Sequence, residues 1–225
     1  MAELHVLRVF VAPGGSGGNP LGVFLDGVAV PEGRRQEVAA DLGFSETVFV
    51  DDPSSGRVRI FTPAAELPFA GHPLVGTSWL LARERTAVAL LRPPVGEVPT
   101  YLDGDGVTWI RGRAEWAPQM SFRQLANPGE VEALAGAPEG LGFVDCWAWE
   151  DEAAGRVRAR VFAPAFGIDE DEATGAAAVR LVSRLGRPLT VRQGAGSLLR
   201  ARPGPDGFAE VGGEVVLDEV RDYPV

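Results

Sequence analysis

The stretch Arg59-Ile60-Phe61-Thr62-Pro63, followed after a short loop by residues 71–81 (GHPLVGTSWLL), occurs twice in this chain in altered form. The second copy is Arg160-Val161-Phe162-Ala163-Pro164, followed by residues 171–182 (DEATGAAAVRLV). Each copy has the pattern of a strand, a loop and an apolar helix. A duplicated unit of this kind predicts two similar lobes with a cleft between them, and one helix N-terminus from each lobe is able to face that cleft.

The spacing of the copies also predicts the domain organisation. The chain has 225 residues, which suits either one large domain or two small ones. Phe162 follows Phe61 by 101 residues, so the repeat favours two lobes of roughly 110 residues. We therefore predict a first lobe over residues 1–112 and a second over residues 113–225.

Composition excludes several classes of function. The net charge is −10, and nucleic-acid binding needs clustered basic residues, so we expect no nucleic-acid partner. The only cysteine, Cys146, rules out an internal disulfide and a thiolate pair for a metal. The start of the chain has no signal-peptide pattern, and no apolar run is long enough to span a membrane. We expect a cytoplasmic protein without a membrane partner.

Hydrophobic patterning predicts many short strands and a few helices. The helix that starts at Pro73 is almost wholly apolar through Ala82, which predicts burial on all sides. A buried helix among short strands suggests a sheet curved around it. The Pro- and Gly-rich residues 113–145 give no clear element. The predicted helices are 31–42, 73–85 and 173–185, and the predicted strands are 4–11, 21–25, 47–50, 58–61, 87–91, 108–111, 156–163, 189–192, 197–201, 208–211 and 214–217.

Gly71-His72-Pro73 lies where the first buried helix begins. The free backbone N–H groups and the dipole of a helix N-terminus favour an anion. His72 is therefore a candidate for binding a substrate carboxylate or carrying a proton. The alternative is a structural histidine that caps the helix.

Two carboxylates are further candidates, each with an alternative. Glu46 lies beside Phe44 and Phe49, and an apolar setting raises the pKa of a carboxyl, as a general base requires. A glutamate on an edge strand, pointing to water, explains Glu46 equally well. Asp171 precedes the second buried helix, whose first turn holds Thr174-Gly175-Ala176. The small residues there let a ligand approach the backbone, but Asp171 also belongs to an acidic run that suits a solvated helix N-terminus.

Taken together, these motifs resemble the PhzF-like (phenazine biosynthesis) isomerase family, which shares the diaminopimelate epimerase fold. The Glu-Leu-Pro-Phe-Ala-Gly-His-Pro string at residues 66–73 is the most specific match, and the second-lobe match is looser. The matching pieces are residues 18–24 (GNPLGVF), 44–50 (FSETVFV), 59–63 (RIFTP), 66–74 (ELPFAGHPL), 160–164 (RVFAP), 171–175 (DEATG) and 193–194 (QG).

The resemblance implies an α+β fold of two pseudo-twofold-related lobes, each a curved, mostly antiparallel sheet around a buried helix. It implies Glu46 as the base that moves a proton on a small carboxylic acid, with His72 and Asp171 as polar partners. It implies no cofactor and no metal, and a homodimer. The substrate contacts that it implies are Asn19, Gly71, Pro73, Thr174, Gly175 and Ala176.

The chain also departs from the family pattern. Ala176 stands where a serine commonly follows Thr-Gly, and the chain is shorter than typical members around residues 135–145. We therefore expect a shortened second lobe. His72 and Thr174 at the helix starts, rather than two thiols, favour isomerisation on one face of the substrate over two-base racemisation. The alternative function is a catalytically lapsed member of the same fold that binds a small acid or a protein partner.

Overall fold

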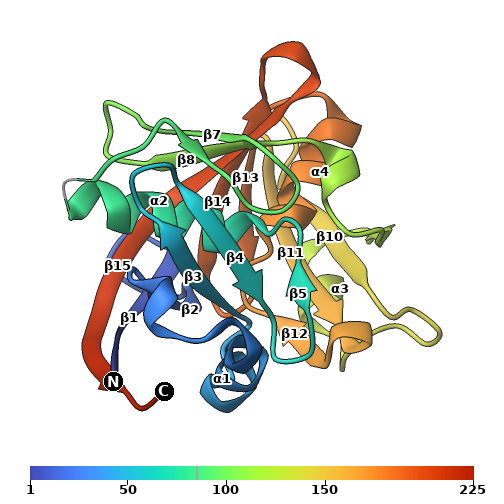
Figure 1. Ribbon diagram of the computed structural model, residues 1–225. Helices are drawn as coiled ribbons and strands as arrows, with labels where there is room; N and C mark the ends of the chain where they lie inside the picture. Colours follow the sequence, from blue (N-terminus) through green and yellow to red (C-terminus); the bar gives the residue numbers. More distant parts are fainter. Residues whose placement is uncertain (85) are drawn as a thin grey trace.

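The structure is a computed structural model that describes residues 1–84 and 86–225, in which a curved sheet surrounds two helices (Figure 1). The elements of the first part are β1 (Ala2–Val11), β2 (Asn19–Phe24), α1 (Arg35–Leu42), β3 (Glu46–Asp52), β4 (Arg57–Phe61), β5 (Glu66–Leu67), α2 (Gly71–Arg83), β6 (Leu90–Leu91), β7 (Val98–Leu102) and β8 (Thr108–Gly112). The elements that follow are β9 (Ser121–Gln124), α3 (Pro128–Glu132), β10 (Val144–Asp151), β11 (Arg156–Ala163), β12 (Ile168–Asp171), α4 (Gly175–Leu185), β13 (Leu189–Gln193), β14 (Ser197–Pro203) and β15 (Ala209–Tyr223).

Short 3₁₀ turns connect several of these elements. They lie at Gly27–Ala29, Glu32–Arg34, Ala114–Trp116, Pro164–Phe166 and Pro205–Gly207. The helix predicted over 31–42 is thus a 3₁₀ turn followed by α1. Among the described residues no helix is both long and apolar enough to cross a membrane.

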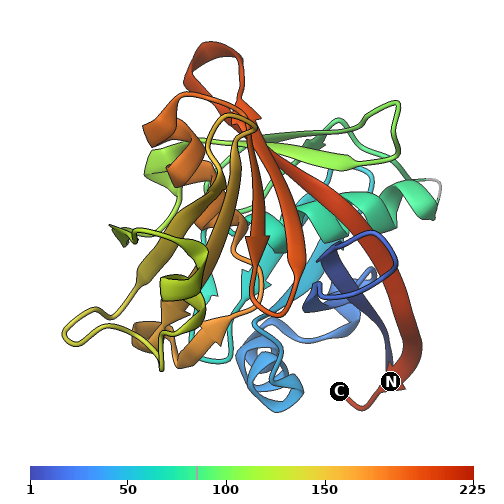
Figure 2. The same cartoon turned by 180° about the vertical axis from the view of Figure 1, so that it is seen from behind.

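The long strand β15 joins the two parts of the sheet. The main path runs β5-β4-β3-β2-β1-β15-β14-β13-β11-β10-β9. Residues 214–223 of β15 pair with β1, whereas residues 209–213 pair with β8 and residues 209–212 with β14. Figure 2 shows β15 in red, running along the back of both halves. The predicted boundary at residue 112 stays a prediction.

The sequence pattern predicted two strands, near 208–211 and 214–217, and this is wrong because β15 is continuous. Gly212 and Gly213 lie in its middle, and a Gly-Gly pair ordinarily indicates a turn. Here the glycines are needed for close packing. A Cβ on Gly213 would lie 2.5 Å from the Phe10 ring, and a Cβ on Gly212 would lie 2.6 Å from the Trp109 ring.

The sequence duplication corresponds to a structural one. The first repeat comprises residues 19–83 (β2–α1–β3–β4–β5–α2), and the second comprises residues 121–185 (β9–α3–β10–β11–β12–α4). In each repeat the first and second strands pair parallel (β2 with β3, and β9 with β10). The second and third strands pair antiparallel (β3 with β4, and β10 with β11). The second repeat begins with shorter elements, since β9 has 4 residues against 6 in β2, and α3 has 5 against 8 in α1. The predicted α+β fold with two related halves is confirmed. The two repeats span equally many residues, and the predicted shortening of the second half relative to the family stays a prediction.

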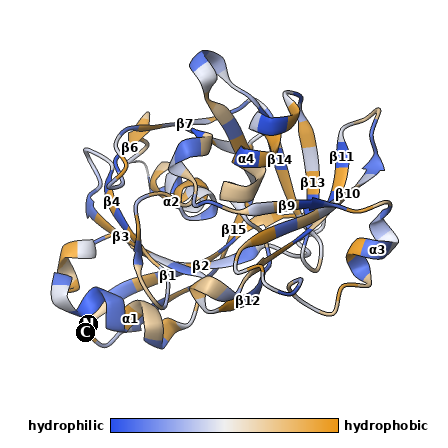
Figure 3. Cartoon of the chain, turned by 90° about the vertical axis from the view of Figure 1, so that its right-hand side faces the viewer, coloured by the Kyte–Doolittle hydropathy of each residue, from blue (hydrophilic) through white to orange (hydrophobic). Residues whose placement is uncertain are grey.

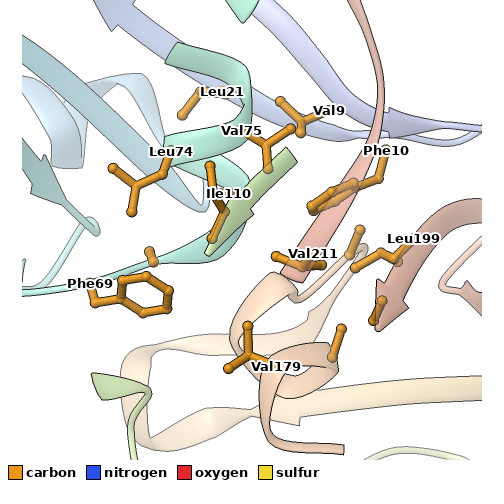
Figure 4. Close-up of a cluster of buried hydrophobic side chains, with 14 of the residues drawn as sticks. Val9, Phe10, Leu21, Phe69, Leu74, Val75, Ile110, Val179, Leu199 and Val211 are labelled. Carbon is orange, nitrogen blue, oxygen red and sulfur yellow. The ribbon is translucent and has the colours of Figure 1, made fainter. Parts of the chain in front are cut away.

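The two helices α2 and α4 lie inside the curved sheet. Leu74 and Val75 of α2 are fully buried and belong to one core cluster with Leu21 and Ile110, while Val179 of α4 faces Leu199 and Val211 (Figure 4). The helix predicted over 73–85 is confirmed over Gly71–Arg83, and Arg85 lies outside the described residues. Figure 3 shows the two chain ends side by side, because Ala2 pairs with Tyr223.

Candidate active site between two helix N-termini

The N-termini of α2 and α4 touch at two glycines. A Cβ on Gly71 would lie 2.7 Å from the Cα of Gly175, and a Cβ on Gly175 would lie 2.8 Å from the Cα of Gly71. Glycine is required at both positions because backbone meets backbone there. The first N–H groups of a helix have no partner within it, so two sets of such groups and the positive ends of two helix dipoles converge at this point.

A cavity of about 50 Å³ opens beside this contact. Four of its lining residues are predicted site residues, and most of the others are apolar. A larger hollow of about 580 Å³ lies elsewhere, on the outer face near residues 28–35, and contains none of the predicted site residues. The lining of the small cavity is Glu46, Thr62, Leu67, Phe69, Ala70, Pro118, Phe143, Ala163, Phe166, Ile168, Asp171, Thr174 and Ala176.

Glu46 begins β3 with its side chain inside the protein, so the alternative that it points to water is wrong. The Nδ1 atom of His72, on the first turn of α2, lies 3.2 Å from Oε2 of Glu46. Burial, and secondarily the nearby Asp171 charge, raises the pKa of Glu46 well above its ordinary value. Burial lowers the pKa of His72 to about 3, and a hydrogen bond to the Pro20 backbone raises it by a smaller amount. His72 is therefore neutral at physiological pH.

Asp171 ends β12 and is also buried. Its Oδ1 accepts a hydrogen bond from Asn19 Nδ2 at 2.7 Å, and its Oδ2 accepts one from Thr174 Oγ1 at 2.5 Å. Ser45 Oγ lies 3.4 Å from Oδ1. Burial raises the pKa of Asp171 to about 6, and these three donors oppose the rise by stabilising the carboxylate. The solvated-cluster alternative fits the exposed Asp169 but not Asp171.

The remaining predicted contacts occupy different places. Thr174 is the N-cap residue of α4, and Ala176 lies in its first turn. Asn19 does not line the cavity, but it connects the repeats by binding Asp171 and the carbonyl of Ala173. Pro73 follows His72 in the buried first turn of α2. Cys146 is buried in a separate cluster with Val144 and Phe162, where it serves as a packing residue.

The sequence motifs did not single out Ser45 and Gln193 as functional residues, although both contact the site. Ser45 Oγ donates to Asn19 Oδ1 at 3.0 Å, and Gln193 forms hydrogen bonds with Asp171 and Thr174. Both residues lie inside matched motifs, at Ser45-Glu46-Thr47 and Gln193-Gly194. Position in a motif was the only available signal, because contact with Asp171 depends on the fold.

Strand register relates the two repeats residue by residue. Thr47 pairs with Phe61, and Val144 pairs with Phe162, which makes Phe143 the counterpart of Glu46. Ile60 and Val161 are equivalent because they precede Phe61 and Phe162. Ile60 pairs with Leu67 and Val161 pairs with Asp171, so Leu67 is the counterpart of Asp171. The helix starts add two more pairs, His72 with Ala176 and Ala70 with Thr174. Each polar site residue thus has an apolar counterpart in the other repeat.

Comparison with known proteins places this geometry in context. The family model described as "phenazine biosynthesis-like protein" (PhzC-PhzF) matches residues 9–115. Two proteins named trans-2,3-dihydro-3-hydroxyanthranilate isomerase are similar. The one from Pseudomonas fluorescens is 31% identical over 79% of this chain and 80% of its own length. The one from Pseudomonas aeruginosa is 34% identical over 79% of this chain and 77% of its own length.

Similarity to a solved structure extends over the whole chain. A phenazine biosynthesis PhzC/PhzF protein from Clostridium difficile aligns over 100% of both chains with a TM-score of 0.79 and 18% identity. At that identity the likeness concerns the fold alone, which agrees with the predicted fold class. Because the first repeat lies inside the matched residues 9–115, its motifs account for most of the sequence similarity to the family model.

Proposed function

The chain belongs to the phenazine biosynthesis-like (PhzC-PhzF) family, and on that premise we propose that it is a cofactor-independent isomerase that moves a proton within a small carboxylic acid. The observation that carries this proposal is the buried Glu46 carboxyl, which lines one cavity with Asp171 and the start of α4. The named isomerases among its relatives support the reaction class.

The substrate carboxylate binds at the helix N-termini in this proposal. The first turns of α2 and α4 provide unpaired N–H groups around Gly71 and Gly175. No lysine or arginine lines the cavity, so backbone groups and helix dipoles are the positive end of the described site. The same groups stabilise the negative charge that develops when a proton leaves a carbon next to the carboxylate.

Glu46 takes the proton from one carbon and returns it to another. A carboxyl with a raised pKa is a stronger base when ionised, and when protonated it still donates readily. The counterpart of Glu46 is Phe143 in the second repeat, which has no proton to exchange. Removal and return of the proton therefore occur on the same face of the substrate.

Asp171 and His72 both lie near the Glu46 carboxyl and affect its acid–base behaviour. The Asp171 charge raises the pKa of Glu46 and so increases its basicity. The neutral His72 places Nδ1 3.2 Å from Oε2, but the two atoms do not form a hydrogen bond, so in this proposal His72 bonds to the carboxyl only after a small rotation of either side chain. The alternative function is binding without catalysis, and a Glu46 side chain pointing away from the cavity would favour it. The Glu46 side chain lines the cavity instead.

The shape of the cavity restricts the substrate. A volume of about 50 Å³ has room for only a few water molecules, so the acid enters after side chains at the rim move. Phe143 and Phe166, whose rings pack edge to face with centroids 5.3 Å apart, form part of that rim. The apolar rim favours an uncharged body on the substrate. A homodimer and a cytoplasmic location stay predictions from the family resemblance.

The test is proton exchange in deuterated water. The wild-type protein is incubated with a panel of small carboxylic acids, including 2,3-dihydro-3-hydroxyanthranilate, and deuterium incorporation is measured by NMR. We expect exchange at carbon with one acid, and a rate about 1,000-fold lower in Glu46→Gln because the base is lost. Glu32→Gln, which removes an exposed carboxylate, is the matched control and keeps the wild-type rate. Equal exchange rates in wild type and Glu46→Gln contradict the proposal. The proposal is also contradicted if none of the acids incorporates deuterium.

A further inference from the structure

Gln193 is a buried amide behind the candidate site. It ends β13, and 1% of its surface is exposed. Its Oε1 accepts the Thr174 N–H at 3.1 Å, and its Nε2 donates to the Asp171 carbonyl at 2.9 Å and to Thr174 Oγ1 at 2.9 Å. All three hydrogen bonds go to Asp171 and Thr174, the two polar residues that the second repeat contributes to the cavity lining.

These contacts determine how the amide is oriented. A flipped amide would place NH₂ against the Thr174 N–H, donor against donor, and would leave the Asp171 carbonyl facing an oxygen. Nε2 therefore faces Thr174 Oγ1 and gives it a hydrogen. A hydroxyl has a single hydrogen to donate, and since Oγ1 already accepts from Gln193, that hydrogen is free to point at Asp171 Oδ2, 2.5 Å away.

We propose that Gln193 is a positioning residue for the acid–base pair: it directs the Thr174 hydroxyl at Asp171, so that Asp171 stays ionised while Glu46 accepts and returns the proton that is exchanged. This role rests on the proposed function. Gln193 does not line the cavity, and it acts on the reaction through Thr174.

Several other groups face Asp171 from the elements packed around it. Asn19 donates from the first repeat. The Ser45 hydroxyl lies 3.4 Å from Asp171 Oδ1 and shares its single hydrogen with the nearer Asn19 Oδ1. Glu46 faces Asp171 across the cavity with His72 behind. The adjacent Glu172 adds a negative charge that opposes ionisation of Asp171. Of these neighbours, Thr174 is the one whose hydroxyl Gln193 orients. Removing Gln193 should therefore weaken one donor to Asp171 and leave the Asn19 and Ser45 hydrogen bonds in place.

The expected consequence is a change in pH dependence. Asp171 and Glu46 titrate as a pair. Loss of a charge-assisted hydrogen bond makes the Asp171 carboxylate harder to form, so both carboxyls are ionised only at higher pH. In Gln193→Met, we expect the acid limb of the kcat/KM profile to move upward by about one pH unit. ¹³C NMR of labelled aspartate carboxyls should show the Asp171 midpoint moving in the same direction.

A double-mutant cycle separates this role from a purely structural one. Thr174→Val removes the hydroxyl and should cause the same upward move, whereas Thr174→Ser keeps the hydroxyl and the wild-type profile. The double variant Gln193→Met/Thr174→Val should move no further than Thr174→Val alone, because both changes interrupt one path. Ser183→Ala, which removes a hydrogen bond to Val179 in the same helix, is the control and should leave both readouts unchanged.

The outcomes distinguish this inference from the proposed function. An unchanged Asp171 midpoint in Gln193→Met and Thr174→Val overturns the positioning role, even in an active isomerase. The positioning role is also overturned if the pH shifts of Gln193→Met and Thr174→Val add up in the double variant. If the Asp171 midpoint moves as expected but wild type exchanges no acid, the positioning role is supported and the proposed function fails. If Gln193→Met does not fold, Gln193→Leu removes the same amide and takes its place, and an Asp171 midpoint that stays at the wild-type value in that variant overturns the positioning role.

Discussion

The two repeats have the same scaffold but different chemistry. Equivalent ion pairs brace their strands, Arg59 with Glu66 in the first and Arg160 with Glu170 in the second, and each helix begins at a glycine. Where the first repeat has Glu46 and His72, the second has Phe143 and Ala176. Where the second has Asp171 and Thr174, the first has Leu67 and Ala70. The duplication therefore preserved the contacts that shape the backbone, and the polar residues of the candidate site are divided between the two repeats.

Among the changes that test the difference between the repeats, the largest expected effect comes from removing the polar contribution of the second repeat. Asp171→Asn keeps the shape of the side chain but removes its charge, and we expect kcat/KM at neutral pH to fall about 100-fold. The pKa of Glu46 is raised by burial and by the Asp171 charge, so losing that charge lowers it. The acid limb of the pH profile should therefore move to lower pH, the direction opposite to that expected for Gln193→Met.

The measurement for this variant is the full pH profile of kcat/KM. Asp169→Asn, an exposed neighbour on the same strand, serves as the control and should match wild type. An acid limb that stays in place or moves upward in Asp171→Asn would show that the Asp171 charge does not act on Glu46.

An intermediate effect is expected where the repeats are alike. Gly175→Ala places a Cβ 2.8 Å from the Cα of Gly71 and 2.9 Å from the His72 nitrogen, which forces the helix starts apart. We expect a loss of about 2 kcal/mol in the free energy of unfolding, measured by urea denaturation, and a similar loss for Gly71→Ala. Gly33→Ala, with no atom within 4 Å of the new Cβ, is the control. Clearly unequal losses for the two site glycines would show that the contact is not symmetric.

The smallest expected effect concerns a difference away from the site. Asp145 is the counterpart of Val48, is 2% exposed, and has an Oδ1 without a hydrogen-bond partner among the described residues. Burial raises its pKa to about 7 from 3.8. A raised folded-state pKa contributes stability at low pH that is lost as the pH rises through that value. From pH 6 to pH 8 the wild type should lose about 1 kcal/mol through this group.

Asp145→Val gives the second repeat the residue found in the first and should abolish this loss. Urea denaturation at pH 6 and pH 8 measures it, and Asp26→Asn, at an exposed position, should keep the wild-type pH dependence. If Asp145→Val loses as much stability as wild type between pH 6 and pH 8, another group causes the pH dependence.

Much of the fold and the site was predictable from local sequence. The apolar run after Pro73 predicted a buried helix because no polar face interrupts it, and the repeated Arg-x-Phe-x-Pro strands predicted two related halves. Glu46, His72 and Asp171 were predicted as site residues from their motifs, and the structure brings them together. The elements that were missed are β5, β7, β9, α3, β10 and β12. All except β10 have five residues or fewer, so their local pattern is weak and their pairing depends on strands distant in sequence. The strand β10 has eight residues, but it begins at the end of the Pro- and Gly-rich stretch 113–145 that gave no clear element.

Sequence by itself determined the duplication, the buried helices and the residue types at the helix starts, because these follow from periodicity and from chemistry within a few positions of the chain. Tertiary structure alone decided that Glu46 points inward, that Asp171 is stabilised by Asn19 across the repeats, and that Gln193 orients Thr174. Those contacts join residues as much as 152 positions apart. The protonation of a buried carboxyl depends on the donors and charges that long-range packing places around it.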